Sequence, residues 1–115
     1  MTGQDFVGAR TDPVVVKLPA EIDATCAAEV GKELAFAFSP AARAVIADMT
    51  ETSFCDSAGI RMLVASYGQA AENGTKLVLV APAGAVRRVF DLVDMGSLVP
   101  VYASLDAAVS GLHAD

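Results

Sequence analysis

Short apolar runs rich in β-branched residues alternate with longer amphipathic stretches along this chain. The runs predict strands at residues 14–18, 45–49, 76–80 and 99–102. A short first strand is expected at residues 4–7, followed by a loop over residues 8–13. Pro100 cannot donate a hydrogen bond to a neighbouring strand, so the last strand is predicted to lie at an edge of the sheet.

Between these runs, apolar residues recur at three- and four-residue spacing, as they do on one face of a helix. This periodicity predicts helices at residues 24–38, 57–72, 83–94 and 104–112. Asn73-Gly74 and Ser39-Pro40 follow two of these stretches and act as stop signals. Strands that alternate with helices of this length predict an α/β layer in which the helices pack on the sheet.

The most informative stretch is residues 52–60, Thr-Ser-Phe-Cys-Asp-Ser-Ala-Gly-Ile, where an apolar run gives way to helical periodicity. Ser57 stands there beside Asp56, at a predicted strand-to-helix turn. The first N–H groups of a helix lack partners and its dipole is positive there, so a phosphate on Ser57 would find donors pointing at it. The simpler alternative is that Asp56 or Ser57 serves only as the N-cap of the helix.

Several segments resemble the STAS family of anti-sigma factor antagonists and their relatives, over residues 14–112. Residues 14–23 resemble the second strand of the family and the Gly-Glu-(Ile or Leu)-Asp turn after it, although Pro19-Ala20 stands where the family usually has Gly. Residues 54–59, Phe-Cys-Asp-Ser-Ala-Gly, resemble its phosphorylation motif, which is the specific match. Residues 74–90 resemble its fourth strand and third helix, and residues 101–108 its closing strand and helix.

For the fold, this resemblance implies a single STAS-like α/β domain over residues 1–115. Its mixed β-sheet is expected to have about four to five strands, with about four helices packed on it. Residues 1–12 are expected to be flexible or to hold the short first strand.

For function, the resemblance implies an anti-sigma factor antagonist without enzymatic activity and without a cofactor. The unphosphorylated protein would bind an anti-sigma factor that is also a serine kinase, and the sigma factor would be released. The kinase would inactivate the antagonist by phosphorylating Ser57, and a serine phosphatase would reverse the modification. The chain is also expected to form a weak homodimer. The implied partner-binding residues are Glu21, Asp23, Asp56, Ser57, Ala58 and Gly59.

The composition of the chain agrees with this interpretation. The chain has 115 residues, 54% of them hydrophobic, and no run approaches the roughly 20 apolar residues of a membrane-spanning helix. Its start lacks the basic and apolar regions of a signal peptide, so a cytoplasmic location is expected.

The formal charge of −6 argues against nucleic acid as a direct partner. The Arg87-Arg88 pair is either the solvated face of a helix or a contact for an acidic patch on a partner.

Residues with catalytic or metal-binding potential are few. Cys26 and Cys55 lack the Cys-x-x-Cys spacing of zinc sites and are expected to be reduced, buried thiols. Ser57 lacks the preceding glycine of a nucleophile elbow, and the single histidine, His113, lies near the end of the chain. Paired carboxylates for acid–base work would have to come from Asp23, Asp48 and Asp56. The simpler interpretation is that Asp23 is the N-cap of the first helix and that Asp48 is a turn or cap residue.

Two further hypotheses remain open at this stage. The first is a STAS-type regulatory subunit of another assembly, such as a lipid-transport ATPase or a stress-sensing complex. The second is a small-molecule or nucleotide binder, although the sequence contains no glycine-rich P-loop.

Overall fold

Four parallel strands form the centre of the protein in a computed structural model, which describes residues 13–114. The strands are β1 (Val14–Lys17), β3 (Ala44–Asp48), β5 (Lys76–Val80) and β6 (Val101–Tyr102), in the spatial order β1-β3-β5-β6. The two central strands, β3 and β5, are buried along almost their whole length. Parallel strands covered on both faces are near-continuous hydrophobic runs, and this is why the apolar pattern identified them.

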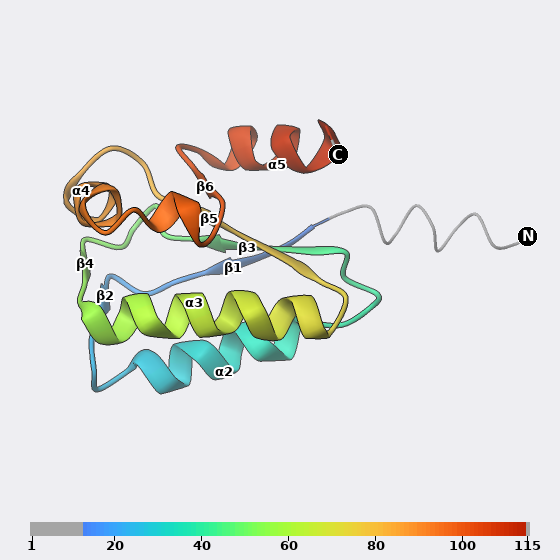
Figure 1. The fold of residues 1–115 in the computed structure, drawn as a ribbon, viewed down its shortest axis with the longest axis horizontal. Coiled ribbons are helices and arrows are strands. Elements are labelled where there is room, and N and C mark those ends of the chain that lie inside the picture. The colour runs from blue at the N-terminus through green and yellow to red at the C-terminus, as the bar shows by residue number, and fades with distance from the viewer. Residues whose placement is uncertain (1–12, 115) are drawn as a thin grey trace, which may run out of the picture.

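Helices cover both faces of this sheet (Figure 1). The helices α2 (Ala27–Ala37) and α3 (Ser57–Glu72) lie side by side on one face, and α5 (Leu105–Ala114) lies on the other. Successive residues of a strand point to opposite faces. Leu77 and Leu79 of β5 accordingly pack in the larger core, with Leu34 of α2, while Val78 and Val80 pack with Ala108 of α5.

A second, smaller sheet lies at the end of the molecule where α3 begins. It consists of β2 (Glu21–Ile22) and β4 (Phe54–Cys55), which pair in parallel. The helix α4 (Ala85–Leu92) packs near β4 and is followed by the 3-10 helix η1 (Met95–Ser97). Neither β2 nor β4 was predicted, because two residues are too few to show an alternating pattern.

The α/β class and the four helices predicted from sequence are confirmed within residues 13–114. The sheet was expected to be mixed, whereas all pairs of named strands within these residues are parallel. The bounds of α3 and β5 agree with the prediction at both ends. The strand expected at residues 4–7 lies outside the described residues. No helix in the described part of the chain is both long and apolar enough to cross a membrane.

Other predicted boundaries were wrong by a few residues, each for a local reason. The helix α2 begins at Ala27 and not at residue 24, because residues 24–26 form a turn whose last N–H donates to Asp23 O. The last strand, β6, begins at Val101, since the N–H of Val99 still donates to Met95 O at 2.9 Å. The helix α4 ends at Leu92, two residues early, because Asp94 adopts the left-handed conformation with φ of 56°.

The edge position predicted for the last strand is confirmed, since β6 lies at one end of the strand order. Pro100 stands directly before β6 and takes part in the sheet only as an acceptor, because its carbonyl receives the N–H of Leu79 at 2.9 Å. Proline has no N–H to donate, so this arrangement leaves no unmet donor at that position.

Candidate functional site

The first turn of α3 fixes the position of Ser57. Asp56 is the N-cap, and its Oδ1 accepts the N–H of Gly59 at 3.1 Å. Its carbonyl accepts the N–H of Ile60 at 3.0 Å, which begins the helical bonding. Of the two capping candidates in the sequence, Asp56 therefore does the capping, and Ser57 is the first helical residue with its side chain exposed to solvent.

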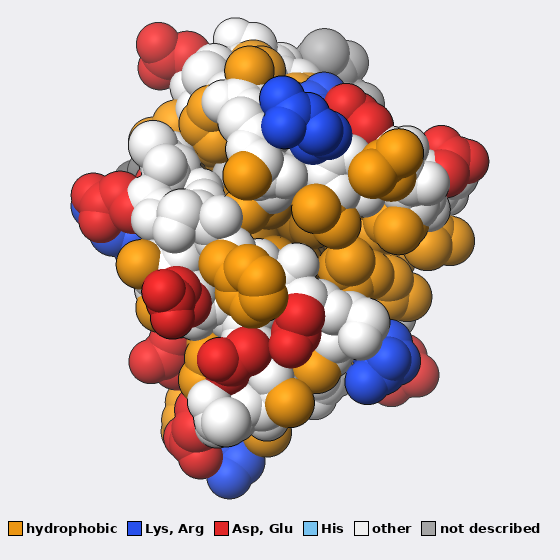
Figure 2. Space-filling model, turned by 90° about the vertical axis from the view of Figure 1, so that its left-hand side faces the viewer, with side chains coloured by type: hydrophobic (Ala, Val, Ile, Leu, Met, Phe, Trp, Pro, Cys, Tyr) orange, Lys and Arg blue, Asp and Glu red, His pale blue; other side chains and the backbone are white. Residues whose placement is uncertain are grey.

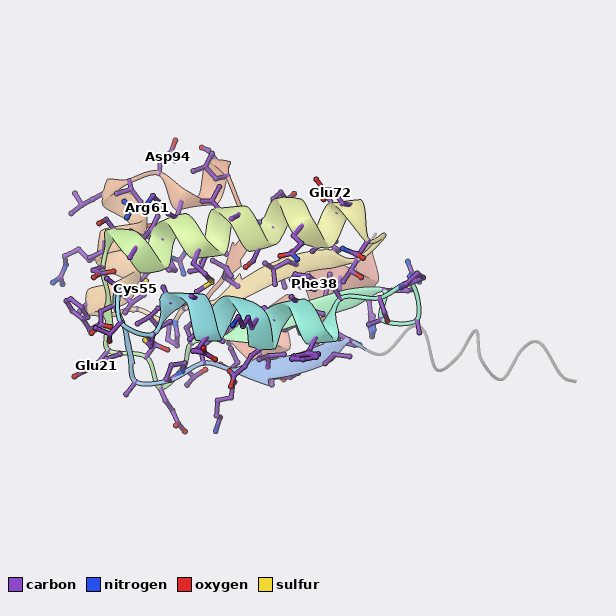
Figure 3. All side chains as sticks on the ribbon, turned by 90° about the horizontal axis from the view of Figure 1, so that it is seen from below. Glu21, Phe38, Cys55, Arg61, Glu72 and Asp94 are labelled. Atoms are coloured by element: carbon purple, nitrogen blue, oxygen red, sulfur yellow. The ribbon has the colours of Figure 1, made fainter. Side chains whose placement is uncertain are left out.

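The short strands β2 and β4 bring the other predicted site residues to the same end of the molecule. Their register sets Glu21 opposite Phe54 and Ile22 opposite Cys55. The N–H of Asp56 then donates to Ile22 O at 3.1 Å, so Asp23 and Asp56 follow neighbouring strand ends. Figure 3 shows Glu21 and Cys55 at this end, far from Phe38 and Glu72. We call the surface of Glu21, Asp23, Phe54, Asp56 and Ser57 the Ser57 face.

Asp23 caps a turn and not the helix α2 itself. Its Oδ1 accepts the N–H of Thr25 at 2.9 Å and the hydroxyl of Thr25 at 2.5 Å. The N-cap of α2 is Cys26, three residues further along, which corrects the sequence interpretation of Asp23 as that cap. The hydroxyl of Thr25, followed by its N–H, holds the pKa of Asp23 below the ordinary value of 3.8, because both bonds favour the carboxylate.

Gly59 lets α3 approach the small sheet closely. A Cβ atom at this position would lie 2.6 Å from Cys55 Sγ and 2.9 Å from Ile22 Cγ2, well inside contact distance. Gly59 is itself buried, and Ala58 is partly buried against the core. The glycine of the Asp-Ser-Ala-Gly motif therefore serves packing.

The two cysteines near the Ser57 face are free thiols. Cys55 is buried and Cys26 is partly exposed, so the expectation that both are buried is wrong for Cys26. Burial, together with the negative charge of Asp56, raises the pKa of Cys55 to about 11. The Cys55 side chain is therefore a neutral thiol near pH 7 and a poor nucleophile.

The loop that leads into β4 is tied to the turn after β1. The hydroxyl of Thr52 donates to Pro19 O at 2.8 Å, and the N–H of Ser53 donates to Ala20 O at 2.8 Å. Among the described non-glycine residues only Asp94 has a positive φ, so the Pro19-Ala20 turn needs no glycine. The presence of Pro19-Ala20 in place of the usual glycine therefore causes no backbone strain in this turn.

Asp48, at the end of β3, has a structural role. Its Oδ1 accepts the N–H of Thr50 at 3.0 Å and also the hydroxyl of Thr50. Asp48 is buried, and these two hydrogen bonds engage its carboxylate within its own loop. This arrangement agrees with the turn interpretation of Asp48.

Exposed apolar side chains accompany the acidic residues, a feature that sequence reasoning missed. Phe54 is 50% exposed, and Leu92 at the end of α4 is 81% exposed. Figure 2 shows hydrophobic side chains across the middle of this end of the molecule, with several acidic side chains close to them. The exposure of Leu92 could have been predicted in part from the periodicity of α4. This periodicity directs Val86 and Phe90 into the core and leaves Leu92 on another face.

The two arginines of α4 differ in their surroundings. Arg88 is exposed, as a solvated helix face requires. Arg87 is partly buried: its Nη1 donates to Ala81 O at 2.9 Å, and its Nε lies 3.5 Å from Asp91 Oδ1. Arg87 therefore fastens α4 to the end of β5 and is not simply a solvated residue.

His113 is too far from Ser57 to act as its base. The histidine lines a cavity together with Tyr67 of α3. Ten residues of α3 separate Tyr67 from Ser57, and a helix rises about 1.5 Å per residue, so that cavity lies roughly 15 Å along the helix. Within residues 13–114 there is also no group of His, Cys, Asp or Glu side chains suited to hold a metal ion.

Fold and site together define a small α/β domain that presents a serine at the N-terminus of a helix. The family model described as the STAS domain matches residues 7–108. The chain belongs to the STAS domain family.

Solved structures of other proteins share this fold. An anti-sigma factor antagonist from Mycobacterium paratuberculosis is 26% identical, with coverage of 86% of this chain and 84% of that chain and a TM-score of 0.77. The Bacillus protein SpoIIAA in its unphosphorylated form is 20% identical, with 88% of each chain covered and a TM-score of 0.67. The murine anion transporter Slc26a9 is 19% identical, with 88% of this chain but 18% of that chain covered and a TM-score of 0.68.

Replacing Gly59 by alanine should destabilise the protein by about 1–3 kcal/mol, because the added methyl group overpacks the contact with Cys55 and Ile22. Gly68 of the same helix is the matched control, since no atom lies within 4 Å of a Cβ placed there. Gly68→Ala should stabilise the protein by roughly 0.5–1 kcal/mol. Urea unfolding of both variants checks this, and equal effects would contradict the close packing at Gly59.

Removing the Thr25 hydroxyl should raise the pKa of Asp23. In Thr25→Val the backbone donor remains, so the pKa should move toward 3.8. A depressed pKa adds stability above the pKa of the unfolded chain, and this contribution disappears as the pH falls through the folded value. An NMR titration of the Asp23 carboxyl carbon measures the shift, with Thr50→Val as the control. An unchanged midpoint in Thr25→Val would refute this account.

Proposed function

We propose that the chain is an anti-sigma factor antagonist whose activity is controlled by phosphorylation of Ser57. In its unphosphorylated form it binds an anti-sigma factor with serine kinase activity, and the sigma factor is thereby released. The kinase then phosphorylates Ser57 and ends the interaction, and a serine phosphatase restores the active form. The observation that carries this proposal is the exposed Ser57 hydroxyl at the first position of α3, directly after a carboxylate that already caps the helix.

The division of labour between Asp56 and Ser57 supports this role. Because the Asp56 carboxylate accepts the N–H of Gly59, the cap does not depend on the Ser57 hydroxyl. Phosphorylation of Ser57 therefore leaves the cap intact. The remaining N–H groups of the first turn and the positive end of the helix dipole lie where a phosphate on Ser57 can use them.

The composition of the Ser57 face suggests how phosphate weakens the complex. An exposed Phe54 favours a closely packed contact, while Glu21, Asp23 and Asp56 already make the surface acidic. A phosphoserine adds about −1.5 to −2 charges near pH 7. Burying that charge in a packed contact, or placing it opposite an acidic partner group, costs free energy, while the fold around it need not change.

The relatives support the same function. The protein from Mycobacterium paratuberculosis, 26% identical, is an anti-sigma factor antagonist, and SpoIIAA has been solved in a phosphorylated form as well. Because the proposed partner is an ATP-using kinase, the protein is expected to act in the cytoplasm. The proposed role is binding and not catalysis, since the one histidine of the chain, His113, lines a cavity far along α3 from Ser57.

The alternative is a STAS-type regulatory unit within another assembly, such as a transporter. The likeness to Slc26a9, a transporter that is much longer than this chain, supports this alternative. Association with a transporter subunit, and none with any serine-kinase anti-sigma factor, would favour this alternative.

The variants of Ser57 test the switch directly. With a cognate kinase and ADP, wild type and Ser57→Ala should both form a complex, and addition of ATP should dissolve only the wild-type complex. Ser57→Asp should bind more weakly than wild type, because it carries a fixed charge. Ser53→Asp is the matched control, since Ser53 is exposed in the same loop but precedes the motif. Size-exclusion chromatography reports the complexes, and equal affinity of Ser57→Ala and Ser57→Asp would remove charge as the switch.

Phe54 should contribute binding energy through its exposed ring. Phe54→Ala should weaken the complex roughly ten-fold or more, as the loss of an aromatic anchor does. Phe36 is the matched control, because it is 92% exposed but lies near the end of α2 that is remote from Ser57. Calorimetric titration measures the affinities, and thermal melting verifies the fold. Equal loss in both variants would mean that the Ser57 face is not the contact.

Replacing Asp23 by asparagine tests the acidic part of the same face. Asparagine still accepts hydrogen bonds from Thr25, so the melting temperature should change little while partner affinity falls. A large fall in melting temperature with unchanged affinity would assign Asp23 to structure alone.

A further inference from the structure

Arg61 lies one helical turn after Ser57 on the surface of α3. Both residues are exposed, and both belong to the same regular helix, four positions apart. Side chains at this spacing are neighbours on a helix surface, with Cβ atoms about 5–6 Å apart. Figure 3 shows Arg61 at the start of α3 and Glu72 at the other end of this helix. The helix therefore brings a guanidinium group close to the Ser57 hydroxyl.

The direction of the two side chains favours a contact between them. In an α-helix each Cα–Cβ bond tilts toward the N-terminus, so the long side chain of Arg61 leans back over the first turn. Ser57 is the first residue of that turn, because Asp56 is the N-cap. An acidic group four residues before a basic one is also the more favourable order, because it agrees with the helix dipole. A phosphate on Ser57 and the guanidinium of Arg61 would stand in this order.

The Arg61 side chain has no other partner within residues 13–114, where no hydrogen bond or ion pair engages it. The surroundings of Arg87 are different, since its Nη1 donates to Ala81 O at 2.9 Å. Asp94, which Figure 3 also places at this end of the molecule, accepts the hydroxyl of Ser97 at 2.7 Å. Arg61 can therefore turn to a phosphate on Ser57 without losing another bond.

A guanidinium matches a phosphate monoester in both charge and shape. Phosphoserine carries about −1.5 to −2 charges near pH 7, and arginine can give two parallel N–H bonds to two of its oxygens. The N–H of Gly59 already donates to Asp56 Oδ1 at 3.1 Å, so the cap does not compete for the phosphate. Because both side chains are exposed, the ion pair is weakened by salt.

We propose that Arg61 is the intramolecular partner of phosphorylated Ser57. This proposal rests on the proposed function, which supplies the phosphate. The ion pair holds the phosphate against the first turn of α3, so that a protein partner meets it in a fixed place. The same pair withdraws from that partner a guanidinium that the unphosphorylated protein leaves free. Arg61 is thus a positioning residue, since it acts through the phosphate.

Phosphoserine incorporated at position 57 of the full chain during translation tests this contact without a kinase. The phosphorus NMR signal is titrated at low ionic strength around pH 6, where phosphoserine loses its second proton. The midpoint should lie about 0.5 pH units lower in the wild-type background than in Arg61→Gln, because a guanidinium favours the dianion. Arg61→Lys, which keeps the charge but loses the paired donors, should give a midpoint between these two.

The other groups around the phosphate are the same in every variant. Glu21, Asp23 and Asp56 disfavour the dianion by charge repulsion, and the positive end of the helix dipole favours it. Their effects cancel in the comparison, so a difference between wild type and Arg61→Gln reports the guanidinium alone.

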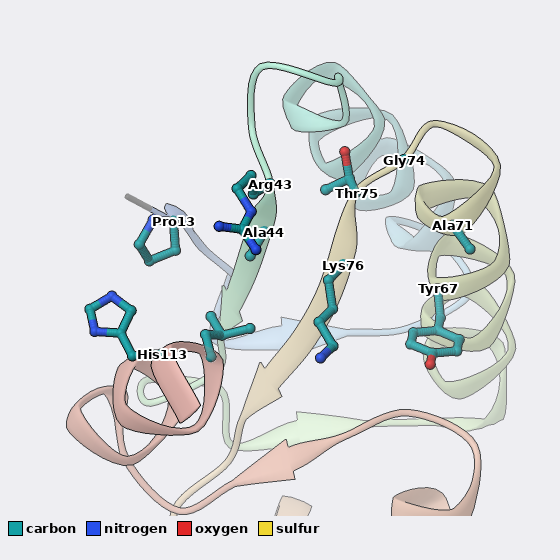
Figure 4. A pocket seen from close by; sticks show the side chains of 10 residues that line it. Pro13, Arg43, Ala44, Tyr67, Ala71, Gly74, Thr75, Lys76 and His113 are labelled. Atoms are coloured by element: carbon teal, nitrogen blue, oxygen red, sulfur yellow. The ribbon is translucent and has the colours of Figure 1, made fainter. Parts of the chain in front are cut away.

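Arg43→Gln is the matched control, because it removes the same charge from an exposed arginine remote from Ser57. Arg43 directly precedes β3 and lines a cavity with Tyr67 and His113 (Figure 4). Its loss should leave the midpoint as in wild type. Phosphoserine should also change the melting temperature more favourably, by about 2 °C, in the wild-type background than in Arg61→Gln.

Equal midpoints in the wild-type background and in Arg61→Gln would overturn the proposal, and so would an equal rise in Arg43→Gln. The result is separate from that of the proposed function. If no serine kinase modifies Ser57, the proposed function fails, but the titration still measures the ion pair. If a kinase does modify Ser57 and Arg61→Gln leaves the midpoint unchanged, only the role of Arg61 is refuted.

Discussion

The close contact between the start of α3 and the strand pair β2–β4 is the constraint on which the Ser57 face depends. Three features maintain it: the bond from Asp56 N–H to Ile22 O at 3.1 Å, the Asp56 cap on Gly59, and the missing Cβ of Gly59 next to Cys55. A cap of this kind is worth about 0.5–2 kcal/mol. Together they hold Ser57 at the first position of α3, with its side chain exposed to solvent.

This arrangement separates the residues that hold the fold from the proposed phosphorylation site. The buried strands β3 and β5 and the helices on both faces hold the fold, and Asp48, Asp56 and Arg87 are engaged in local hydrogen bonds. Ser57 takes no part in the cap, so a charge added to it acts on the surface and not on the core. A modification can then alter binding without unfolding the domain, as a reversible switch requires.

Much of this architecture could be predicted from sequence, because its signals are local. The periodicity of α3 and the apolar run of β5 fixed both of their ends, and Pro100 marked the edge strand. The start of α2 could not be read in the same way, since Asp23 favours a turn as readily as a helix cap. The exposure of Phe54 and Leu92, and the cavity that Arg43, Tyr67 and His113 line, depend on tertiary packing, which brings together residues far apart in the chain.

The central claim is that Ser57 is the phosphoacceptor of a serine-kinase anti-sigma factor. The most direct measurement is incubation of the protein with candidate kinases of this type and ATP, followed by intact mass and peptide mass spectrometry. The account predicts the addition of one phosphoryl group, located on Ser57, and no addition without a kinase. Phosphate on Thr52 or Ser53 with Ser57 unmodified, or labelling in the absence of a kinase, would contradict it.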